Sequence, residues 1–157
     1  MNTLYYNFYE VVKLKLNFDE HYLLCSVDFW NDTTDFTSEI LHSNQRYFID
    51  ILDNYFNQSE YEIDFNLLNL NGLSKFYVDI YKTLVKTPVG KTTTYRKLSE
   101  DAGYKNAYRA TGSCMKRNRW PIFIPCHRVL SANSIGGFSS GINLKVKLLE
   151  LEKRFAF

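Results

Sequence analysis

Residues 94–116, TYRKLSEDAGYKNAYRATGSCMK, decide the fold that we predict for the second half of the chain. Thr94 is a residue type that caps the start of a helix, and Gly103 suits the left-handed conformation in which many helices end. We therefore expect one short helix from Thr94 through residue 102 and a second over about residues 106–116. Two short helices joined by a few residues that include a glycine are typical of a helix-turn-helix.

The second of these helices should have one packing face and one free face. The packing face is predicted from small residues that recur every three or four positions, namely Ala107, Ala110 and Cys114. The free face, which could meet phosphate groups, holds Arg109, Ser113 and Lys116. Small residues at Ala110, Gly112 and Ser113 would let the helix backbone approach a partner closely. The alternative is an ordinary basic surface helix, but no acidic residue occurs between Asp101 and Glu150.

Charge divides the chain near residue 70. Residues 1–70 contain three basic and twelve acidic side chains, a net charge of −9, whereas residues 71–157 contain sixteen basic and five acidic ones, a net charge of +11. Together they make the overall charge of +2. Such asymmetry points to a polyanionic partner such as nucleic acid. The alternative is two solvated surfaces of opposite charge, because net charge bears on association rather than on fold.

Length and composition exclude several classes of protein. A chain of 157 residues is one domain or two small ones, and its 45% hydrophobic content excludes a disordered chain. No apolar run approaches the ~20 residues of a membrane span, and the first ten residues lack a signal-peptide pattern. Cys25, Cys114 and Cys126 are too few for a disulfide framework or a four-ligand zinc site. We therefore expect a soluble cytoplasmic protein with reduced thiols and no membrane contact.

Residues 1–70 are predicted to form a strand-rich α+β domain. Alternation over residues 12–16 and strand-forming residues over 21–30 predict two antiparallel strands. Helical spacing begins at Thr37, and residues 61–65 alternate again as in a strand. The apolar residues with helical spacing are Ile40, Leu41, Tyr47, Phe48, Ile51, Leu52 and Phe56. The possible metal ligands of this part, for which ordinary packing is the better interpretation, are His21, Cys25 and His42.

Residues 71–157 are predicted to form a helical, winged-helix-like domain that contains the helix-turn-helix. A linker over residues 66–74 leads into a helix over residues 76–86, which ends before the turn Pro88-Val89-Gly90. In the last helix, Lys145 and Glu152 are seven residues apart and therefore share a face. The apolar stripe of that helix is Leu144, Leu148, Leu151 and Phe155. Without further information, a surface ion pair with a basic neighbour is the simpler interpretation of Glu152.

Residues 122–130, IFIPCHRVL, contain the most unusual chemistry of the chain. A thiol, an imidazole and a guanidinium interrupt a run that would otherwise be buried, and each buried polar group needs a partner. Cys126 could be a nucleophile whose thiolate is stabilised by His127 and Arg128. Adjacency alone is weak support, because neighbours on an extended strand point to opposite faces. A lone cysteine in an apolar run is more often a small packing residue.

The segment Pro125-Cys126-His127-Arg128-Val129 resembles the active site of the O6-alkylguanine-DNA alkyltransferases, which take an alkyl group from DNA onto a cysteine. The resemblance continues in order over most of residues 76–155 and covers about half of the chain. Its other motifs are Pro88-Val89-Gly90-Lys91-Thr92 with Tyr95, Ala107-Tyr108-Arg109-Ala110-Thr111-Gly112 with Met115, Asn118 with Pro121, Phe138-Ser139-Ser140-Gly141, and Lys145, Leu148, Leu149 and Glu152.

The resemblance implies a role for each residue of a catalytic group. Cys126 would attack the alkyl carbon, His127 would remove the thiol proton through a water, and Glu152 would orient His127. Asn118 would hold the preceding turn to the cysteine segment, and Lys145 would place a cation near the leaving guanine. Such a nucleophile is not regenerated, so the reaction would occur once per protein and need no cofactor or metal. Arg128 is expected to be structural.

The resemblance also implies that the damaged base is flipped out of the duplex, because its O6 cannot be reached inside the stack. Arg109 would fill the gap that the base leaves, and Tyr95 would press on the 3′ phosphate and offer its hydroxyl to guanine. The other residues expected to contact DNA are Arg96, Ala110, Gly112, Ser113 and Lys116. The substrate pocket is expected to be lined by Val129, Phe138, Ser139 and Ser140. The family often has Tyr and Gly where Phe138 and Ser140 stand, so we expect a different tolerance for bulky O6 groups.

The implied partner is double-stranded DNA that contains O6-alkylguanine, with O4-alkylthymine as a further possible substrate. The protein would be a monomer in the cytoplasm, near the nucleoid, or in the nucleus of a eukaryote. Two other functions remain open at this point. One is a sensor that binds lesions without alkyl transfer, and the other is a cysteine hydrolase, which would need an oxyanion site that the sequence does not reveal.

Overall fold

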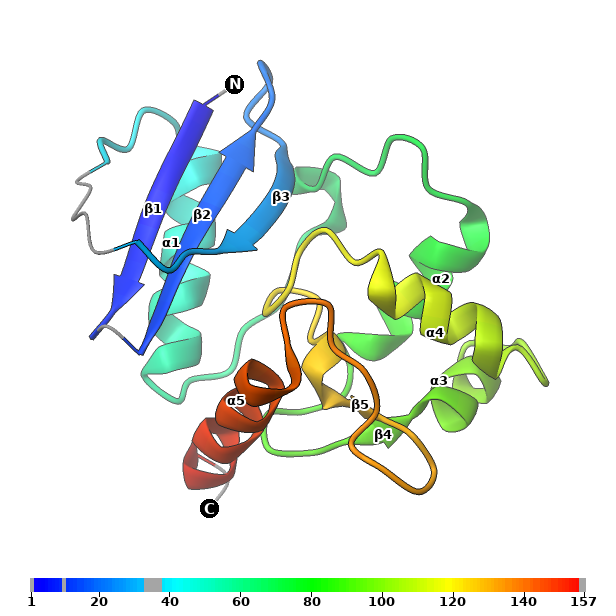
Figure 1. Cartoon of the computed structure of the whole chain (residues 1–157). Helices are drawn as coiled ribbons and strands as arrows, with labels where there is room; N and C mark the ends of the chain where they lie inside the picture. Colours follow the sequence, from blue (N-terminus) through cyan, green and yellow to red (C-terminus); the bar gives the residue numbers. More distant parts are fainter. Residues whose placement is uncertain (1, 10, 33–37, 156–157) are drawn as a thin grey trace. The chain divides into compact units, whose positions relative to one another are not determined.

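The structure is a computed structural model that describes residues 2–9, 11–32 and 38–155 (Figure 1). The chain divides into two compact units, Met1–Asn71 and Gly72–Phe157. A small antiparallel sheet with a helix forms the first unit, and the second unit is mainly helical, which confirms the α+β class (Figure 1). None of the helices in the described part is long and apolar enough to cross a membrane.

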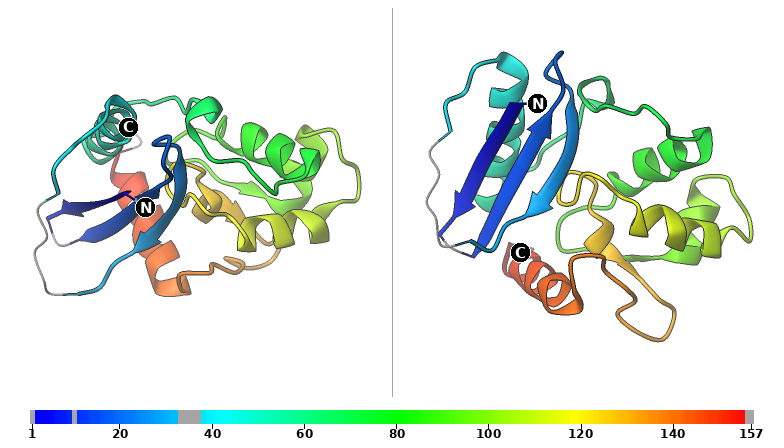
Figure 2. Two further views of the ribbon diagram at one scale, coloured as in Figure 1. Left: turned by 90° about the horizontal axis from the view of Figure 1, so that it is seen from above. Right: turned by 45° about the horizontal axis from the view of Figure 1, so that its top comes forward.

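An antiparallel sheet in the order β1-β2-β3 forms the first unit, from β1 (Asn2–Phe8), β2 (Val12–Phe18) and β3 (Leu24–Phe29). The predicted hairpin is therefore present, and β1 is an additional strand that the sequence pattern did not reveal. Apolar side chains of β2 alternate toward α1 (Ser43–Phe56), which lies along one face of the sheet (Figure 2). The side chain of Phe18 meets Phe48 of α1, with ring centroids 5.9 Å apart.

Helix α1 begins at Ser43, later than the helical spacing of the sequence indicates; Thr37, where that spacing begins, lies outside the described residues. A capping box sets the start, because Nδ1 of His42 accepts a hydrogen bond from the Asn44 amide and Oε1 of Gln45 accepts one from the His42 amide. His42 therefore acts as a helix cap. The helix contributes Phe48, Ile51 and Leu52 to the core of this unit.

The strand predicted over residues 61–65 is wrong. Instead, the short 3-10 helix η1 (Phe65–Leu67) follows an irregular segment. The hydroxyl of Tyr47 donates to the Glu62 carbonyl and accepts from the Asp64 amide, so it occupies backbone groups that a neighbouring strand would otherwise bind. The first part of the predicted linker also belongs to this unit, since the Asn69 amide donates to the Leu24 carbonyl.

Three helices of the second unit pack together: α2 (Lys75–Leu84), α3 (Tyr95–Asp101) and α4 (Tyr108–Lys116). Thr94 caps α3 by accepting from the Lys97 amide, and Gly103 has the left-handed φ of 88° expected beyond its end. The predicted helix-turn-helix is therefore present. Its second helix begins two residues later than expected, because Asn106 is left-handed (φ 59°) and cannot continue a helix.

The rest of the second unit supports the segment that contains Cys126. Strand β4 (Thr93–Thr94) pairs in parallel with β5 (Val129–Leu130). Strand β5 directly follows the 3-10 helix η2 (Cys126–Arg128). The last helix is α5 (Ile142–Phe155), which contacts η2. Figure 1 shows β4 and β5 next to each other.

The buried faces of α4 and α5 differ from those predicted. In α4 the buried residues are Thr111, Cys114 and Met115, whereas Ala110 is exposed beside Arg109, because the helix is rotated slightly from the position that small residues alone suggest. In α5 the fully buried side chains are Lys145, Leu148 and Glu152. Leu144 and Leu151 of the predicted stripe are only half-buried, and the side chain of Phe155 lies outside the described part.

Thr111 offers a test of packing in the helix-turn-helix. Its hydroxyl is fully buried and has no hydrogen-bond partner among the described residues. We expect Thr111→Val to raise the free energy of unfolding by about 1 kcal/mol, because an unpaired buried hydroxyl costs about 1–3 kcal/mol. Thr83→Val is the matched control, since the Thr83 hydroxyl donates to the Asp79 carbonyl at 2.8 Å. Urea denaturation should show stabilisation by Thr111→Val and not by Thr83→Val; the reverse order would contradict the expectation.

Candidate active site

A strained, buried turn leads into the segment that contains Cys126. Every residue from Pro121 to Val129 is buried, and the Ile124 amide donates to the Trp120 carbonyl to close the turn. Ile122 has a φ of 75°, which is rare for a β-branched residue and costs on the order of 1–3 kcal/mol. Fully buried apolar neighbours, including Trp120 and Phe123, hold the turn in this conformation.

Cys126 begins a single turn of 3-10 helix and does not lie on an extended strand. Successive side chains in such a turn point about 120° apart, so Cys126, His127 and Arg128 enter three different environments. The objection that neighbours on an extended strand point to opposite faces therefore does not apply here. The turn directs the thiol, the imidazole and the guanidinium to three different sides. Val129 follows as the first residue of β5, paired with Thr93 of β4.

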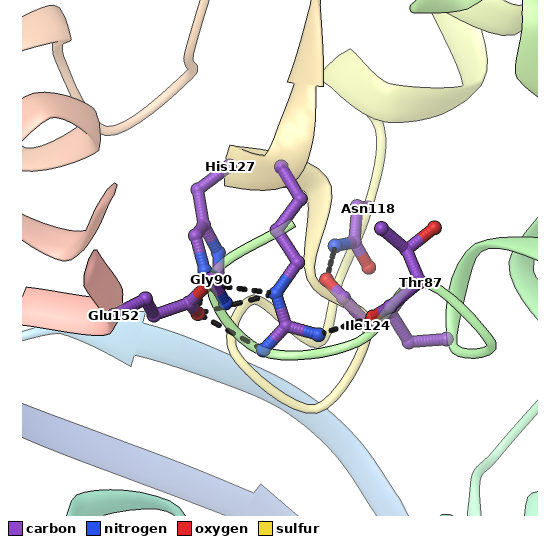
Figure 3. Close-up of polar contacts among 7 residues, drawn as sticks. Thr87, Gly90, Asn118, Ile124, His127 and Glu152 are labelled. Atoms are coloured by element: carbon purple, nitrogen blue, oxygen red, sulfur yellow. Dashed lines mark hydrogen bonds and ion pairs between the residues drawn. The ribbon is translucent and has the colours of Figure 1, made fainter. Parts of the chain in front are cut away.

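Asn118 connects the turn to the thiol. Its Nδ2 donates to the Ile124 carbonyl at 2.8 Å (Figure 3). The same Nδ2 donates to Sγ of Cys126 at 3.1 Å. Its Oδ1 accepts from the Trp120 amide at 3.0 Å. The amide side chain thus satisfies both ends of the strained turn and leaves one N–H directed at the sulfur.

Glu152 of α5 binds two other segments of the second unit, η2 and the turn at Gly90 (Figure 3). Its Oε1 lies 2.5 Å from Nε2 of His127, and its two oxygens accept three hydrogen bonds from the Arg128 guanidinium. Oε2 also accepts from the Gly90 amide at 3.1 Å. The remaining arm of Arg128 donates to the Thr87 carbonyl at 2.8 Å. Glu152 is fully buried, so the interpretation as a surface ion pair is wrong.

The protonation states of this group follow from its contacts. Burial alone would raise the pKa of Glu152, but the hydrogen bonds and charges of His127 and Arg128 outweigh it and hold that pKa well below its usual range. Burial lowers the pKa of His127 despite the neighbouring carboxylate. At neutral pH, Glu152 is therefore ionised and paired with Arg128, while His127 is neutral and donates from Nε2. Nδ1 of His127 is then an acceptor, and it is buried without a partner among the described residues.

Two neighbours counteract the effect of burial on the Cys126 thiol. Burial raises the pKa of Cys126, whereas the Asn118 N–H and the positive charge of Lys145 lower it. Lys145 is itself fully buried, and its Nζ donates to the Val129 carbonyl at 2.6 Å and to the Gly137 carbonyl at 3.1 Å. Burial lowers the pKa of Lys145. The two carbonyls hold the ammonium between β5 and the loop that follows it.

A pocket of about 370 Å³ opens onto Cys126. It lies within the second unit, between the start of α3, the end of α4 and the loop after β5. Its lining residues are Tyr95, Gly112, Met115, Lys116, Cys126, Gly137, Phe138 and Ser139. This pocket, which is bounded by the helix-turn-helix, gives access to the thiol, and His127 and Glu152 are fully buried.

Comparison with known proteins identifies the family. Residues 75–154, about half of the chain, match the family model described as "6-O-methylguanine DNA methyltransferase, DNA binding domain". The chain belongs to this family. A methylated-DNA–protein-cysteine methyltransferase of Metallosphaera sedula is 40% identical over 101 residues, which make up 64% of this chain and 63% of that protein. The methylated-DNA–protein-cysteine methyltransferase of Saccharolobus solfataricus is 42% identical over 77 residues, which make up 49% of this chain and 50% of that protein. The chain thus spans half to just under two thirds of these relatives.

Solved structures of the family extend the likeness to nearly the whole chain. The crystal structure of Mycobacterium tuberculosis OGT in complex with DNA has a TM-score of 0.76 at 27% identity, over 99% of this chain and 94% of that chain. The O6-methylguanine-DNA methyltransferase of Pyrococcus kodakaraensis shares the fold at 22% identity, with a TM-score of 0.66 over 96% and 98% of the two chains. The family that the sequence resembles is therefore confirmed, and the first unit follows the same fold.

The structure brings together most of the residues that the family resemblance singled out. Cys126, His127, Glu152 and Asn118 form one connected group, and Tyr95, Phe138 and Ser139 line the pocket in front of it. Val129 and Ser140 do not line this pocket. Val129 is fully buried and its carbonyl accepts from Lys145, which also donates to the Gly137 carbonyl. Lys145 therefore joins the pocket loop to β5 and places a positive charge near Cys126.

The side chains expected to contact DNA lie on the outside of the helix-turn-helix. Those that are exposed are Arg96, Arg109, Ala110, Ser113 and Lys116. Gly112 has open space beyond its Cα, so a ligand can approach the helix backbone at this position. Tyr95 is only half-buried and borders the pocket, and burial raises its pKa. Arg96 and Arg109 extend this cationic surface over both helices.

Two contributors to the site were not predicted from the sequence as partners of the buried charges. Thr87 and Gly90 supply a backbone carbonyl and a backbone amide to the Arg128–Glu152 pair, and backbone groups leave no signal in side-chain chemistry. The sequence predicted the turn Pro88-Val89-Gly90, but it did not predict the hydrogen bond from the Gly90 amide to Glu152. Met115 and Gly137 also border the pocket; Met115 was noted only as part of the family motif.

Glu152 should govern the stability of the second unit. We expect Glu152→Gln to lower the free energy of unfolding at pH 7 by about 3–5 kcal/mol, because it leaves the Arg128 charge buried without a counterion. Folding lowers the pKa of Glu152, so the stability that this carboxylate supplies is complete above the unfolded value near 4.5 and is lost as the pH falls below it. The variant should therefore show a flatter loss of stability in acid.

Glu150→Gln is the matched control, since Glu150 is exposed on the same helix. Chemical denaturation of both variants between pH 3 and 7 measures the difference. An equal effect of the two substitutions, or an unchanged acid slope in Glu152→Gln, would contradict a role for the buried pair.

Proposed function

We propose that this protein repairs duplex DNA by transferring the alkyl group of O6-alkylguanine to Sγ of its own Cys126, once per molecule. The observation that carries the proposal is the position of Cys126. Its thiol lies at a pocket bounded by the helix-turn-helix, with a neutral histidine and a buried carboxylate behind it. Methylated-DNA–protein-cysteine methyltransferases among the relatives support it, as does the structure of an M. tuberculosis family member in complex with DNA.

The proton of Cys126 would leave through His127. Nε2–H of His127 binds Glu152, so the lone pair of Nδ1 is available to a water that bridges to the thiol. The ionised Glu152 stabilises the imidazolium formed in this step. The thiolate accepts a hydrogen bond from the Asn118 N–H and is stabilised by the positive charge of Lys145. Arg128 keeps Glu152 ionised, which makes it a positioning residue.

The thiolate would then displace guanine from the alkyl carbon. The S–C bond forms as the C–O6 bond breaks, the electron pair passes to the guanine, and the guanine takes up one proton. Tyr95 can donate a hydrogen bond to this leaving group, because burial raises its pKa and keeps it a neutral phenol at physiological pH. Met115 and Phe138 offer apolar surface to the alkyl group itself. The product is a thioether, which the site has no means to reverse.

The exposed face of α4 would bind the duplex. Arg109 fills the space of the flipped base, the small residues Ala110, Gly112 and Ser113 allow close approach, and Arg96 and Lys116 neutralise phosphates. The protein would act as a monomer. It would act at the chromosome, in the nucleoid or in a nucleus. O4-alkylthymine, whose reacting oxygen occupies a comparable position, is a further substrate to test.

Mass spectrometry tests the transfer directly. After incubation with a duplex containing O6-methylguanine, we expect one added methyl group on the peptide that contains Cys126. Cys126→Ala should bind the duplex and gain no methyl group, whereas Cys25→Ala, the control in the first unit, should react as the unchanged protein does. Binding without methylation would favour the lesion sensor, and repeated turnover of an ester or amide would favour a hydrolase.

Arg109 provides a test of base flipping that leaves the thiol intact. We expect Arg109→Ala to slow methyl transfer from duplex DNA by about tenfold or more, which corresponds to about 1.4 kcal/mol of barrier. Reaction with free O6-benzylguanine, which needs no flipping, should keep its rate. Lys153→Ala removes an exposed cation from α5 and serves as control. Equal slowing of the duplex and free-base reactions by Arg109→Ala would contradict the assigned role.

A further inference from the structure

Tyr108 is an exposed aromatic residue at the first position of α4. It retains 38% of its surface, so its side chain is only partly packed against its own unit. No hydrogen bond of its hydroxyl is found in the described part of the chain. Part of the ring is therefore accessible to the groups that lie beside it.

Two arginines from different helices lie against this ring. The guanidinium carbon of Arg96, from α3, is 5.3 Å from the ring centroid, and that of Arg109, from α4, is 5.9 Å from it. Both distances are within the range in which a ring attracts a cation electrostatically. Tyr108 therefore links the two helices of the helix-turn-helix through their cationic side chains.

The surroundings leave both guanidiniums available to an anion. Arg96 and Arg109 are exposed. Of the two acidic residues of α3, Asp101 is paired with Lys97 at 3.0 Å, and Glu100 is exposed one turn after Arg96. Two like charges gathered at one site repel each other, and an attractive ring between the helices offsets part of that repulsion. Guanidinium groups match the geometry of phosphate oxygens, so a pair of arginines on this surface fits the phosphates of a nucleic acid.

We propose that Tyr108 is a positioning residue for DNA, which holds Arg96 and Arg109 in the directions that they need in the complex. The proposal rests on the function proposed above. A free arginine side chain loses most of its rotamers when it binds, and ordering one such side chain weakens affinity severalfold. A ring that orders both side chains beforehand reduces this loss. In this protein Tyr108 would thus set the affinity for DNA and the ease with which Arg109 enters the stack, without itself taking part in the chemistry.

The experiment compares Tyr108→Leu and Tyr108→Phe. Affinity for a duplex containing O6-methylguanine is measured at several salt concentrations, together with the rates of reaction with that duplex and with free O6-benzylguanine. Tyr108→Leu should weaken duplex binding by roughly tenfold and reduce the salt dependence, although no cation has been removed. Tyr108→Phe should retain the affinity of the unchanged protein, because it keeps the ring. Both variants should react normally with the free base.

A double-mutant cycle shows whether the ring acts through an arginine. If it does, Tyr108→Leu should weaken binding much less in an Arg96→Ala background than alone. Tyr9→Leu, which removes an exposed tyrosine from the first unit, is the control and should leave binding unchanged.

Four results would overturn the proposal. Two concern affinity for the duplex: normal binding by Tyr108→Leu, or equal weakening of binding by Tyr108→Phe. The others are additive effects on binding in the double-mutant cycle, and loss of the free-base reaction in Tyr108→Leu, which would show a structural role. Failure of the unchanged protein to bind or react with the duplex would instead refute the proposed function, so the two failures are distinguishable.

Discussion

The buried carboxylate of Glu152 is the interaction on which the second unit depends. An ion in the interior is very costly unless it is paired and fully hydrogen-bonded, and Glu152 meets this condition through Arg128, His127 and the Gly90 amide. These partners come from the turn before β4 and from η2, while the carboxylate comes from α5. Meeting the needs of one charge therefore brings together three segments that are distant in sequence, and it fixes the tautomer of His127 in the same step.

The site is divided between a rigid buried side and an open outer side. On the buried side, Asn118 holds the strained turn at Ile122 and directs an N–H at Cys126, while Lys145 ties the pocket loop to β5. On the outer side, α4 presents cations and small residues next to the pocket. Burial raises the pKa of the Cys126 thiol on the inner side, and the pocket in front of it borders the helix-turn-helix.

Sequence reasoning succeeded where the signal was local. Thr94 and Gly103 marked the ends of α3, and alternation over residues 12–16 marked β2. It failed where tertiary contacts override local pattern. Residues 61–65 alternate like a strand, yet Tyr47 binds their backbone groups, and the rotation of α4 buries Thr111 in place of Ala110. Glu152 looked like a surface residue because nothing in its own neighbourhood indicates the partners that it meets.

The sequence by itself determined the family, the helix-turn-helix and the charge division near residue 70, and it singled out Cys126 as the candidate nucleophile, because each of these depends on residue types and not on contacts between distant segments. Only the tertiary structure decided that Glu152 and Lys145 are buried, that Cys126 begins a turn, and that Tyr108 gathers two arginines from separate helices. Gly90 and Glu152 are 62 positions apart, and His127 and Glu152 are 25 apart. Contacts over such separations arise from packing of the whole unit, and residue order alone does not specify which distant groups will meet.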